Sequence, residues 1–161
     1  MQNEVYLLLG SNLGHRKKNL SEALHQIGLR AGAIQKVSSI YETQAWGKTD
    51  QPTFLNQVVQ ISCPLTPYEL LTKLLAIEDE LGRQRNEVWG PRQMDLDILF
   101  FGEEAVHQAD LVIPHPGIAN RRFTLVPLAE IAPDFIHPLL RKSCRQLLAE
   151  CTDLLRVTLF L

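Results

Sequence analysis

Alternation between hydrophobic and polar residues along the chain predicts its strands. The clearest case is 54–63, where one face is apolar and the other carries Phe54 and Asn56. Less regular runs, rich in β-branched or aromatic residues, predict the remaining strands at 4–9, 34–43, 94–101, 111–113 and 156–161. We therefore expect a sheet built from short segments.

Helical spacing of apolar residues predicts two longer helices between these strands. The first runs from about 17 to 30. The second opens with Thr66-Pro67-Tyr68-Glu69, a capping box with proline at the first helical position, and runs to 81. A second capping box at Ser143 opens a helix that ends at about Cys151. Before it stand prolines at positions 114, 116, 127 and 133, which leave room only for short helices.

The order of the elements up to residue 101 is strand–helix–strand–strand–helix–strand. This is the split βαβ, ferredoxin-like order of an α+β protein, which gives a largely antiparallel sheet. Neither a regular strand–helix alternation nor a glycine-rich nucleotide-binding motif is present, so a Rossmann fold is not expected. The length of 161 residues fits one domain over 1–161.

Composition narrows the classes of function. With 16 basic and 18 acidic residues the net charge is −2, which disfavours a nucleic-acid or anionic-membrane surface. No apolar run is long enough to span a membrane, and the N-terminal residues do not form a signal peptide. The odd number of cysteines, 3, argues against a disulfide framework and favours a reducing cytoplasm.

Asp95 and Asp97 are the strongest local signal for chemistry. Residues i and i+2 of a strand share a face, so these carboxylates are expected side by side, opposite Leu96, Ile98 and Phe100. Two such charges repel unless a cation lies between them, and Mg²⁺ prefers carboxylate and phosphate oxygens. A solvated polar strand face, or pairing with nearby arginines, explains the same pattern equally well.

The polar loop before this strand carries the opposite charge. Arg83, Arg85 and Arg92 surround Trp89, and guanidinium groups bind phosphate through paired hydrogen bonds. An ordinary charged surface loop has the same composition. Beside the aspartate pair, however, the loop favours a magnesium–polyphosphate ligand over a bare metal.

Five other positions are weaker candidates. Glu78 lies on an apolar helical stripe, where it could bind a ligand or pair with a nearby arginine. His115 stands between two prolines, which bias it to an extended conformation, and Arg121 follows closely. Phe54 shares a strand face with Asn56, a combination that suits a flat heterocycle but is also common in cores.

Several motifs together identify a family resemblance that extends from Val5 to about Pro133. The chain resembles the 6-hydroxymethyl-7,8-dihydropterin pyrophosphokinases of the folate pathway. The matching segments are Gly10-Ser11-Asn12-Leu13-Gly14, Asp50-Gln51-Pro52-x-Phe54-Leu55-Asn56, Gly82-Arg83, Trp89-Gly90-Pro91-Arg92-x-x-Asp95-Leu96-Asp97-Ile98, Pro114-His115-Pro116, Asn120-Arg121-x-Phe123 and Pro127-Leu128-x-Glu130-Ile131-Ala132-Pro133.

The resemblance implies a ferredoxin-like α/β/α sandwich that transfers diphosphate from ATP to the hydroxymethyl group of the pterin and releases AMP. It implies that Asp95 and Asp97 hold two Mg²⁺ ions and that Arg83 and Arg92 are catalytic. The ATP site implied by the resemblance consists of Glu78, Arg85, Trp89, Arg92, Ile98, His115 and Arg121. The implied pterin site consists of Thr43, Gln44, Trp46, Phe54, Asn56, Trp89, Asp95 and Phe123.

Two alternatives to the enzyme remain distinguishable by experiment: a non-catalytic ferredoxin-like binding module and a nucleic-acid-binding sandwich. The acidic pair beside a phosphate-type loop disfavours the first, and the net charge disfavours the second. We expect a cytoplasmic enzyme, a monomer, with no nucleic-acid or membrane partner. The chain departs from the family pattern at Gln44-Ala45-Trp46, where a proline is common, and at Asp110, where some members have a basic residue.

Overall fold

The computed structural model describes residues 2–44, 52–82 and 94–161. Its central sheet has the strand order β5-β1-β4-β3-β8, with β2 also paired to β4, and every pairing is antiparallel. The strands of this sheet are β1 (Asn3–Ser11), β2 (Ala33–Val37), β3 (Tyr41–Thr43), β4 (Phe54–Cys63), β5 (Asp95–Phe101) and β8 (Val157–Leu159). The predicted ferredoxin-like α+β order is confirmed. β1 lies between β5 and β4, and β2 and β3 both pair with β4 on its other side.

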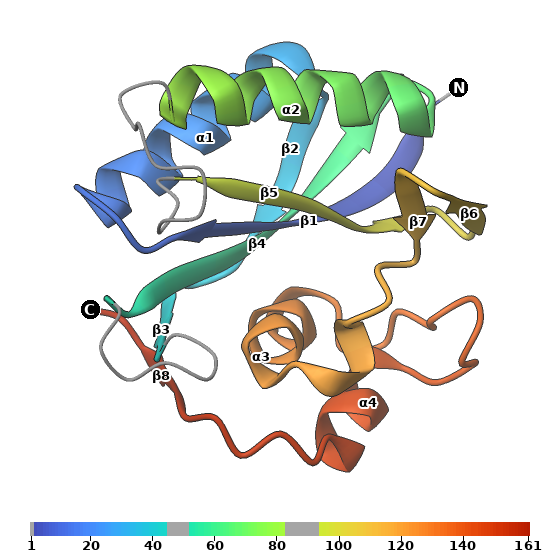
Figure 1. The fold of residues 1–161 in the computed structure, drawn as a ribbon. Helices are drawn as coiled ribbons and strands as arrows, with labels where there is room; N and C mark the ends of the chain where they lie inside the picture. Colours follow the sequence, from blue (N-terminus) through green and yellow to red (C-terminus); the bar gives the residue numbers. More distant parts are fainter. Residues whose placement is uncertain (1, 45–51, 83–93) are drawn as a thin grey trace.

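Helices cover both faces of the sheet, as Figure 1 shows. On one face lie α1 (Arg16–Arg30) and α2 (Pro67–Gly82), and on the other lie α3 (Arg122–Ile131) and α4 (Cys144–Glu150). A short 3-10 helix, Ile118–Asn120, leads into α3, and β6 (Val106–Gln108) pairs with β7 (Leu111–Ile113) as a separate hairpin. This arrangement is an α/β/α sandwich with two hydrophobic cores.

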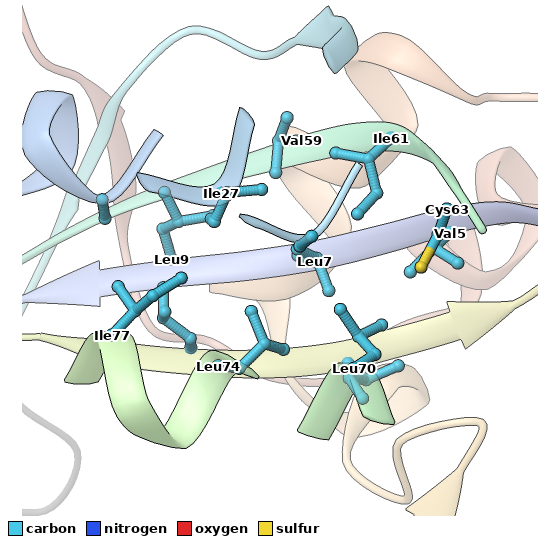
Figure 2. Packing of buried hydrophobic residues seen from close by; sticks show 14 of the residues in the cluster. Val5, Leu7, Leu9, Ile27, Val59, Ile61, Cys63, Leu70, Leu74 and Ile77 are labelled. Carbon is cyan, nitrogen blue, oxygen red and sulfur yellow. The ribbon is translucent and has the colours of Figure 1, made fainter. Parts of the chain in front are cut away.

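The first core fills the space between the sheet and the pair α1 and α2 (Figure 2). Alternate residues of β1 and β4 point into it, among them Leu7 and Val59, and meet Ile27 of α1 and Leu74 of α2. These side chains are fully or almost fully buried. Complete burial of a leucine or isoleucine stabilises a fold by about 1.5–3 kcal/mol, so this layer holds the sheet rigid.

The second core lies under α3 and α4 and uses the alternate residues of the same strands. Tyr6, Leu8 and Val58 face it, and Leu125 and Leu128 of α3 pack against them. The central strand β1 is thus buried on both faces. The prediction for 54–63 is confirmed: Val58 belongs to this core, while Leu55, Val59, Ile61 and Cys63 belong to the other.

The helix signals are mostly confirmed at atomic detail. The backbone N–H of Glu69 donates to Thr66 Oγ1 at 3.2 Å, and that of Thr66 donates to Glu69 Oε1 at 2.9 Å, which completes the capping box. Ser143 Oγ accepts from the Gln146 N–H at 3.1 Å. The helices among the prolines are short, as expected: a 3-10 helix of 3 residues and α3 of 10 residues, with Pro127 inside it. Burial of Leu125 and Leu128 against the sheet offsets the hydrogen bond that proline cannot make.

The predicted strand 34–43 is divided in two by Ser38. Its hydroxyl accepts from the Val58 N–H at 2.9 Å, and its carbonyl accepts from Gln57 Nε2 at 2.9 Å. The Ser38 N–H still donates to the Val58 carbonyl at 2.9 Å, so side-chain bonds add to the backbone bond at this break. β2 and β3 pair with successive parts of the same strand β4. The break lets β3 follow its own direction beside the end of β4.

The predicted orientation of Phe100 is wrong. The pairing of β1 with β5 shifts register between Tyr6 and Leu7, which leaves Leu99 as an extra, bulged residue. Leu96 and Ile98 face the α1–α2 core as expected, but Phe100 faces the α3–α4 core. Strict alternation does not hold across a bulge, which reverses the face of every residue beyond it.

Hydrogen bonds fix both ends of α3 to other parts of the molecule. At its first residue, the Arg122 N–H donates to Asp153 Oδ2 at 2.9 Å, so the C-terminal segment caps the helix. At its other end, the Glu130 carboxylate accepts from the Ser39 N–H and Oγ, and from the Tyr41 hydroxyl at 2.6 Å. Both termini of α3 are thus fixed to neighbouring strands or loops. Among the described residues, no helix is long and apolar enough to cross a bilayer.

His137 predicts a loss of stability in acid. The imidazole is buried, its Nδ1 accepts from the Leu139 and Leu140 N–H groups, and burial lowers its pKa below the ordinary value. Because the unfolded chain then binds the proton more readily, the free energy of unfolding should fall as pH drops below about 6.5.

Urea unfolding of the wild type and of His137→Asn between pH 7.5 and 5.5 measures this effect. The variant should have the shallower dependence, by at most about 1.4 kcal/mol per pH unit for one proton. His25→Asn, on the exposed side of α1, is the matched control and should retain the wild-type slope. Equal slopes for His137→Asn and the wild type would contradict the prediction.

Candidate active site

A cavity of about 430 Å³ opens on the α3 side of the sheet. It lies where β1 and β3 end and β4 and β5 begin, beside the start of α3, and its size is that of a small-molecule site. The lining residues are Leu8, Gly10, Thr43, Gln44, Phe54, Asn56, Asp95, Asp97, Asn120, Arg121 and Phe123.

Strand register brings the floor of the cavity together. Gly10 of β1 pairs with Asn56 of β4 on one side and with Asp95 of β5 on the other. A Cβ at Gly10 would lie 2.9 Å from Asn56 Nδ2, so only glycine leaves room for that amide. Residues far apart in the sequence thus meet at one point of the sheet.

We expect Gly10→Ala to weaken binding at the amide end of the cavity, because the methyl group displaces the Asn56 side chain. An increase of roughly tenfold in the KM for the aromatic substrate, with a smaller change for the other substrate, is the expected result. Gly28→Ala is the control, because its Cβ would make only ordinary contact with Ile34, at 3.6 Å. That control should stabilise α1 by about 0.5–1 kcal/mol. Equal KM values for Gly10→Ala and the wild type would contradict the role of the close approach.

One end of the cavity presents aromatic rings and unpaired acceptors. Phe54 and Phe123 line the cavity from β4 and α3. Asn56 Nδ2 donates to the Leu9 carbonyl at 3.2 Å, which orients the amide and leaves Oδ1 without a partner. In the described part of the chain, Thr43 Oγ1 and Asn56 Oδ1 are two of the three buried side-chain atoms that lack a hydrogen bond. Buried polar atoms normally have partners, so both are suited to bind polar groups of a ligand.

The other end is acidic. Asp95 and Asp97 line the cavity from the same face of β5, as the sequence pattern predicts. Glu78 of α2 accepts a hydrogen bond from the Leu96 N–H at 2.6 Å and so fixes the peptide between the two aspartates. Among the described residues, no group of three or more acidic, histidine or cysteine side chains could hold a metal. Two carboxylates fit a cation that takes its other ligands from phosphate and water.

His115 and Arg121 supply donors beside the carboxylates. His115 Nδ1 accepts from the Gly117 N–H at 2.9 Å, which leaves Nε2 to carry the proton of the neutral ring. Burial lowers the pKa of His115, Asp97 opposes this shift, and Arg121 adds to it. The Arg121 guanidinium lies 5.8 Å from the centre of the Phe123 ring, and Gly117 leaves room for it. A neutral imidazole N–H and a guanidinium are both donors for an anion.

The structure brings together most of the predicted site residues that it describes. Eight of them line the cavity: Thr43, Gln44, Phe54, Asn56, Asp95, Asp97, Arg121 and Phe123. Three lie outside the lining: Glu78, Ile98 and His115. Ile98 faces the α1–α2 core, and His115 interacts electrostatically with Asp97 and Arg121. The remaining predicted residues fall outside the described part of the chain: Trp46, Arg83, Arg85, Trp89 and Arg92.

Sequence reasoning missed three lining residues, Leu8, Gly10 and Asn120. Gly10 and Asn120 stand inside the quoted motifs, and Leu8 shares a strand face with Gly10, so alternation carried a signal for it. Asp110, where some family members are expected to have a basic residue, accepts a hydrogen bond from the Tyr68 hydroxyl at 3.0 Å.

An antiparallel sheet covered by helices, with a cavity that is aromatic at one end and acidic at the other, defines a small-molecule enzyme of the α+β class. The model of the family 7,8-dihydro-6-hydroxymethylpterin-pyrophosphokinase (HPPK) matches residues 6–133. The chain belongs to this family.

Relatives of the same description occur in several bacteria. A 2-amino-4-hydroxy-6-hydroxymethyldihydropteridine pyrophosphokinase of Aquifex aeolicus is 40% identical over 148 residues, which cover 92% of each chain. Those of Synechocystis and Bacillus subtilis are 46% and 49% identical and cover 89% and 81% of this chain, and 75% and 79% of their own lengths.

Solved structures confirm the fold. A Plasmodium falciparum HPPK-DHPS structure matches with a TM-score of 0.78 at 18% identity, over 93% of this chain. The chain spans less than half of that longer protein, 43% of its length. The likeness at this identity concerns the fold alone.

Proposed function

We propose that the chain transfers the terminal diphosphate of ATP to the hydroxymethyl group of 6-hydroxymethyl-7,8-dihydropterin in folate biosynthesis. The observation that carries the proposal is a cavity that combines two buried, unpartnered acceptors with an aspartate pair in an HPPK-family chain. The first feature suits a flat heterocycle with N–H groups on its edge, and the second suits a cation bound to polyphosphate.

The pterin ring would lie between Phe54 and Phe123. Its amino and ring N–H groups would donate to Asn56 Oδ1 and Thr43 Oγ1, the atoms that otherwise lose their hydrogen bonds on burial. The family resemblance adds Gln44, Trp46 and Trp89 to the same subsite. This placement turns the hydroxymethyl group toward Asp95.

ATP would lie at the acidic end of the cavity and along the α2 side of β5. Arg121 and the Nε2–H of His115 would donate to phosphate oxygens, and Arg83, Arg85 and Arg92 would add further positive charge. Glu78, Ile98 and Trp89 are assigned to the nucleotide subsite. Arginines suit this task because they remain charged at every relevant pH.

Asp95 and Asp97 would hold two Mg²⁺ ions together with the phosphates. When bound, Mg²⁺ neutralises charge that develops on the phosphate oxygens during transfer. The two carboxylates lie on one strand face and Glu78 fixes the peptide between them, so their relative position is set before any ligand binds.

The chain's own residues position the reactants. The hydroxyl oxygen of the pterin attacks the β-phosphorus of ATP, the bond from that phosphorus to the α–β bridging oxygen breaks, and AMP leaves with that oxygen. Asp95 is the nearest carboxylate to accept the hydroxyl proton. Such transfer depends on alignment and charge neutralisation more than on covalent help, which agrees with a site of carboxylates, arginines and a histidine.

The direct test mixes the purified protein with ATP, Mg²⁺ and 6-hydroxymethyl-7,8-dihydropterin and quantifies AMP and pterin diphosphate. Equal amounts of both products, lost when EDTA is added, are the expected result. Hydrolysis of ATP without pterin diphosphate, or no AMP from folded protein, would contradict the proposal.

We also propose a cytoplasmic monomer, and sedimentation at micromolar concentration tests the oligomeric state.

A further inference from the structure

A cluster on the opposite face of the sheet from the cavity joins the two strands that carry its aromatic end. Arg16 Nη1, at the start of α1, donates to Glu42 Oε2 at 3.1 Å, to the Thr53 carbonyl at 3.0 Å and to Thr53 Oγ1 at 2.7 Å. Thr53 Oγ1 in turn donates to Glu42 Oε2 at 2.7 Å. We name the cluster Arg16, Glu42 and Thr53 the clasp.

Each acceptor of the clasp is the chain neighbour of a cavity residue. Glu42 precedes Thr43 and Thr53 precedes Phe54, and Thr43 and Phe54 are register partners between β3 and β4. Because successive strand residues point to opposite faces, the clasp holds one side of this pairing while Thr43 and Phe54 line the cavity on the other. The clasp also joins the described ends of the connection between β3 and β4.

The C-terminal segment, which sequence reasoning left without a function, covers the clasp. Strand β8 pairs with β3, with Thr158 opposite Glu42, and the Phe160 N–H donates to the Ile40 carbonyl at 2.9 Å. The Arg16 guanidinium lies 5.7 Å from the centre of the Phe160 ring. Figure 1 shows the C-terminus beside β3 and the start of β4.

The charges of the clasp are partly withdrawn from water. The side chains of Arg16 and Glu42 retain 24% and 34% of their exposure. The hydrogen bond from Thr53 lowers the pKa of Glu42, burial opposes this, and Arg16 lowers it further. An ion pair that is half-buried and shares a third partner is geometrically defined, unlike a mobile surface pair.

We propose that Arg16 is a positioning residue for the heterocycle: through Glu42 and Thr53 it sets the separation of Thr43 and Phe54, and β8 holds it in place. This inference rests on the proposed function, because it names the residues that prepare the pterin end of that site. Arg16 is not among the residues that line the cavity, so its effect should appear through Thr43 and Phe54, in pterin binding and not in ATP binding.

The test is Arg16→Met, which keeps the aliphatic part of the side chain and removes every donor. We expect the KM for the pterin to rise roughly tenfold, while the KM for ATP and kcat stay within about twofold, since small displacements in a site have large effects on the aligned group alone. Thr53→Val should shift the pterin KM in the same direction. The double variant should raise the pterin KM by less than the product of the two single fold-changes, because both substitutions break one network.

Arg30→Met is the matched control. Arg30 is on the same helix and forms an exposed ion pair with Glu80 at 2.7 Å, so its loss should leave both KM values unchanged. Folded Arg16→Met with a wild-type pterin KM, or with both KM values raised equally, would overturn the proposal. Should Arg16→Met fail to fold, Thr53→Val decides by the same criteria.

Binding of 6-hydroxymethylpterin, followed by its fluorescence with a non-hydrolysable ATP analogue present, separates this inference from the proposed function. A wild type that binds the pterin but releases no AMP contradicts the proposed function only, and the inference is then decided by the Kd values of the variants. A wild type that binds no pterin contradicts both.

Discussion

Asp97→Asn is expected to lower kcat by roughly 10³-fold or more while the protein keeps its fold, because charge stabilisation is the main source of catalysis in phosphoryl transfer. The substitution keeps the shape of the side chain and removes one of the two carboxylates that line the cavity from β5. Asp97 is half-buried on a strand whose apolar face remains intact, so the core does not depend on its charge. Steady-state AMP release over a range of Mg²⁺ concentrations measures kcat. Far-ultraviolet circular dichroism of the same samples shows whether the fold is kept.

The control for Asp97→Asn is Asp134→Asn. Asp134 forms an exposed ion pair with Arg145 at 3.2 Å, and loss of such a pair has little effect on stability or activity. An Asp97→Asn enzyme with wild-type kcat at every Mg²⁺ concentration would exclude Asp97 as a metal ligand. Recovery of activity at high Mg²⁺ alone would instead indicate weakened binding of the ion.

Local signals in the sequence were sufficient for most elements of the fold. The capping box at Thr66 and Glu69 depends on residues three apart, and it forms as predicted. The break at Ser38 could not be predicted, because it requires the Val58 N–H and Gln57 from a distant strand as partners. Pro127 lies inside a helix because packing of its neighbours on the sheet outweighs the local preference.

Some features of the candidate site could likewise be predicted from the sequence, and others depend on contacts between distant strands. The aspartate pair and the shared face of Phe54 and Asn56 follow from strand alternation within a few residues, and the family resemblance added Thr43 and Phe123. What sequence reasoning did not supply is the meeting of Gly10 with Asn56 and Asp95, because that depends on the register of three strands. Arg16 was missed for a related reason, since its partners are Glu42 of β3 and Thr53, the residue before β4.

Phe100→Ala is expected to destabilise the protein by about 3–5 kcal/mol, a large part of the usual total for a domain. The ring is fully buried and packs against Phe135 at 4.5 Å, His137 at 5.4 Å and Tyr6 at 6.1 Å between ring centres. Urea unfolding with an unchanged m value measures the loss. Leu29→Ala, at a side chain that is 67% exposed, should change stability by no more than about 0.5 kcal/mol.

The same variant tests the bulge at Leu99, which turns Phe100 away from the face of Leu96 and Ile98. If the ring packs in the α3–α4 core, Phe100→Ala and Phe135→Ala remove one shared contact, and their effects should differ from additivity by at least about 0.5 kcal/mol. If β5 alternated without a bulge, Phe100 would instead couple to Leu70 or Leu74 of α2 and be additive with Phe135. Coupling to Phe135, together with additivity toward Leu74→Ala, therefore places the aspartates and Phe100 on one face of β5, with the cavity at one end of that face and the aromatic cluster at the other.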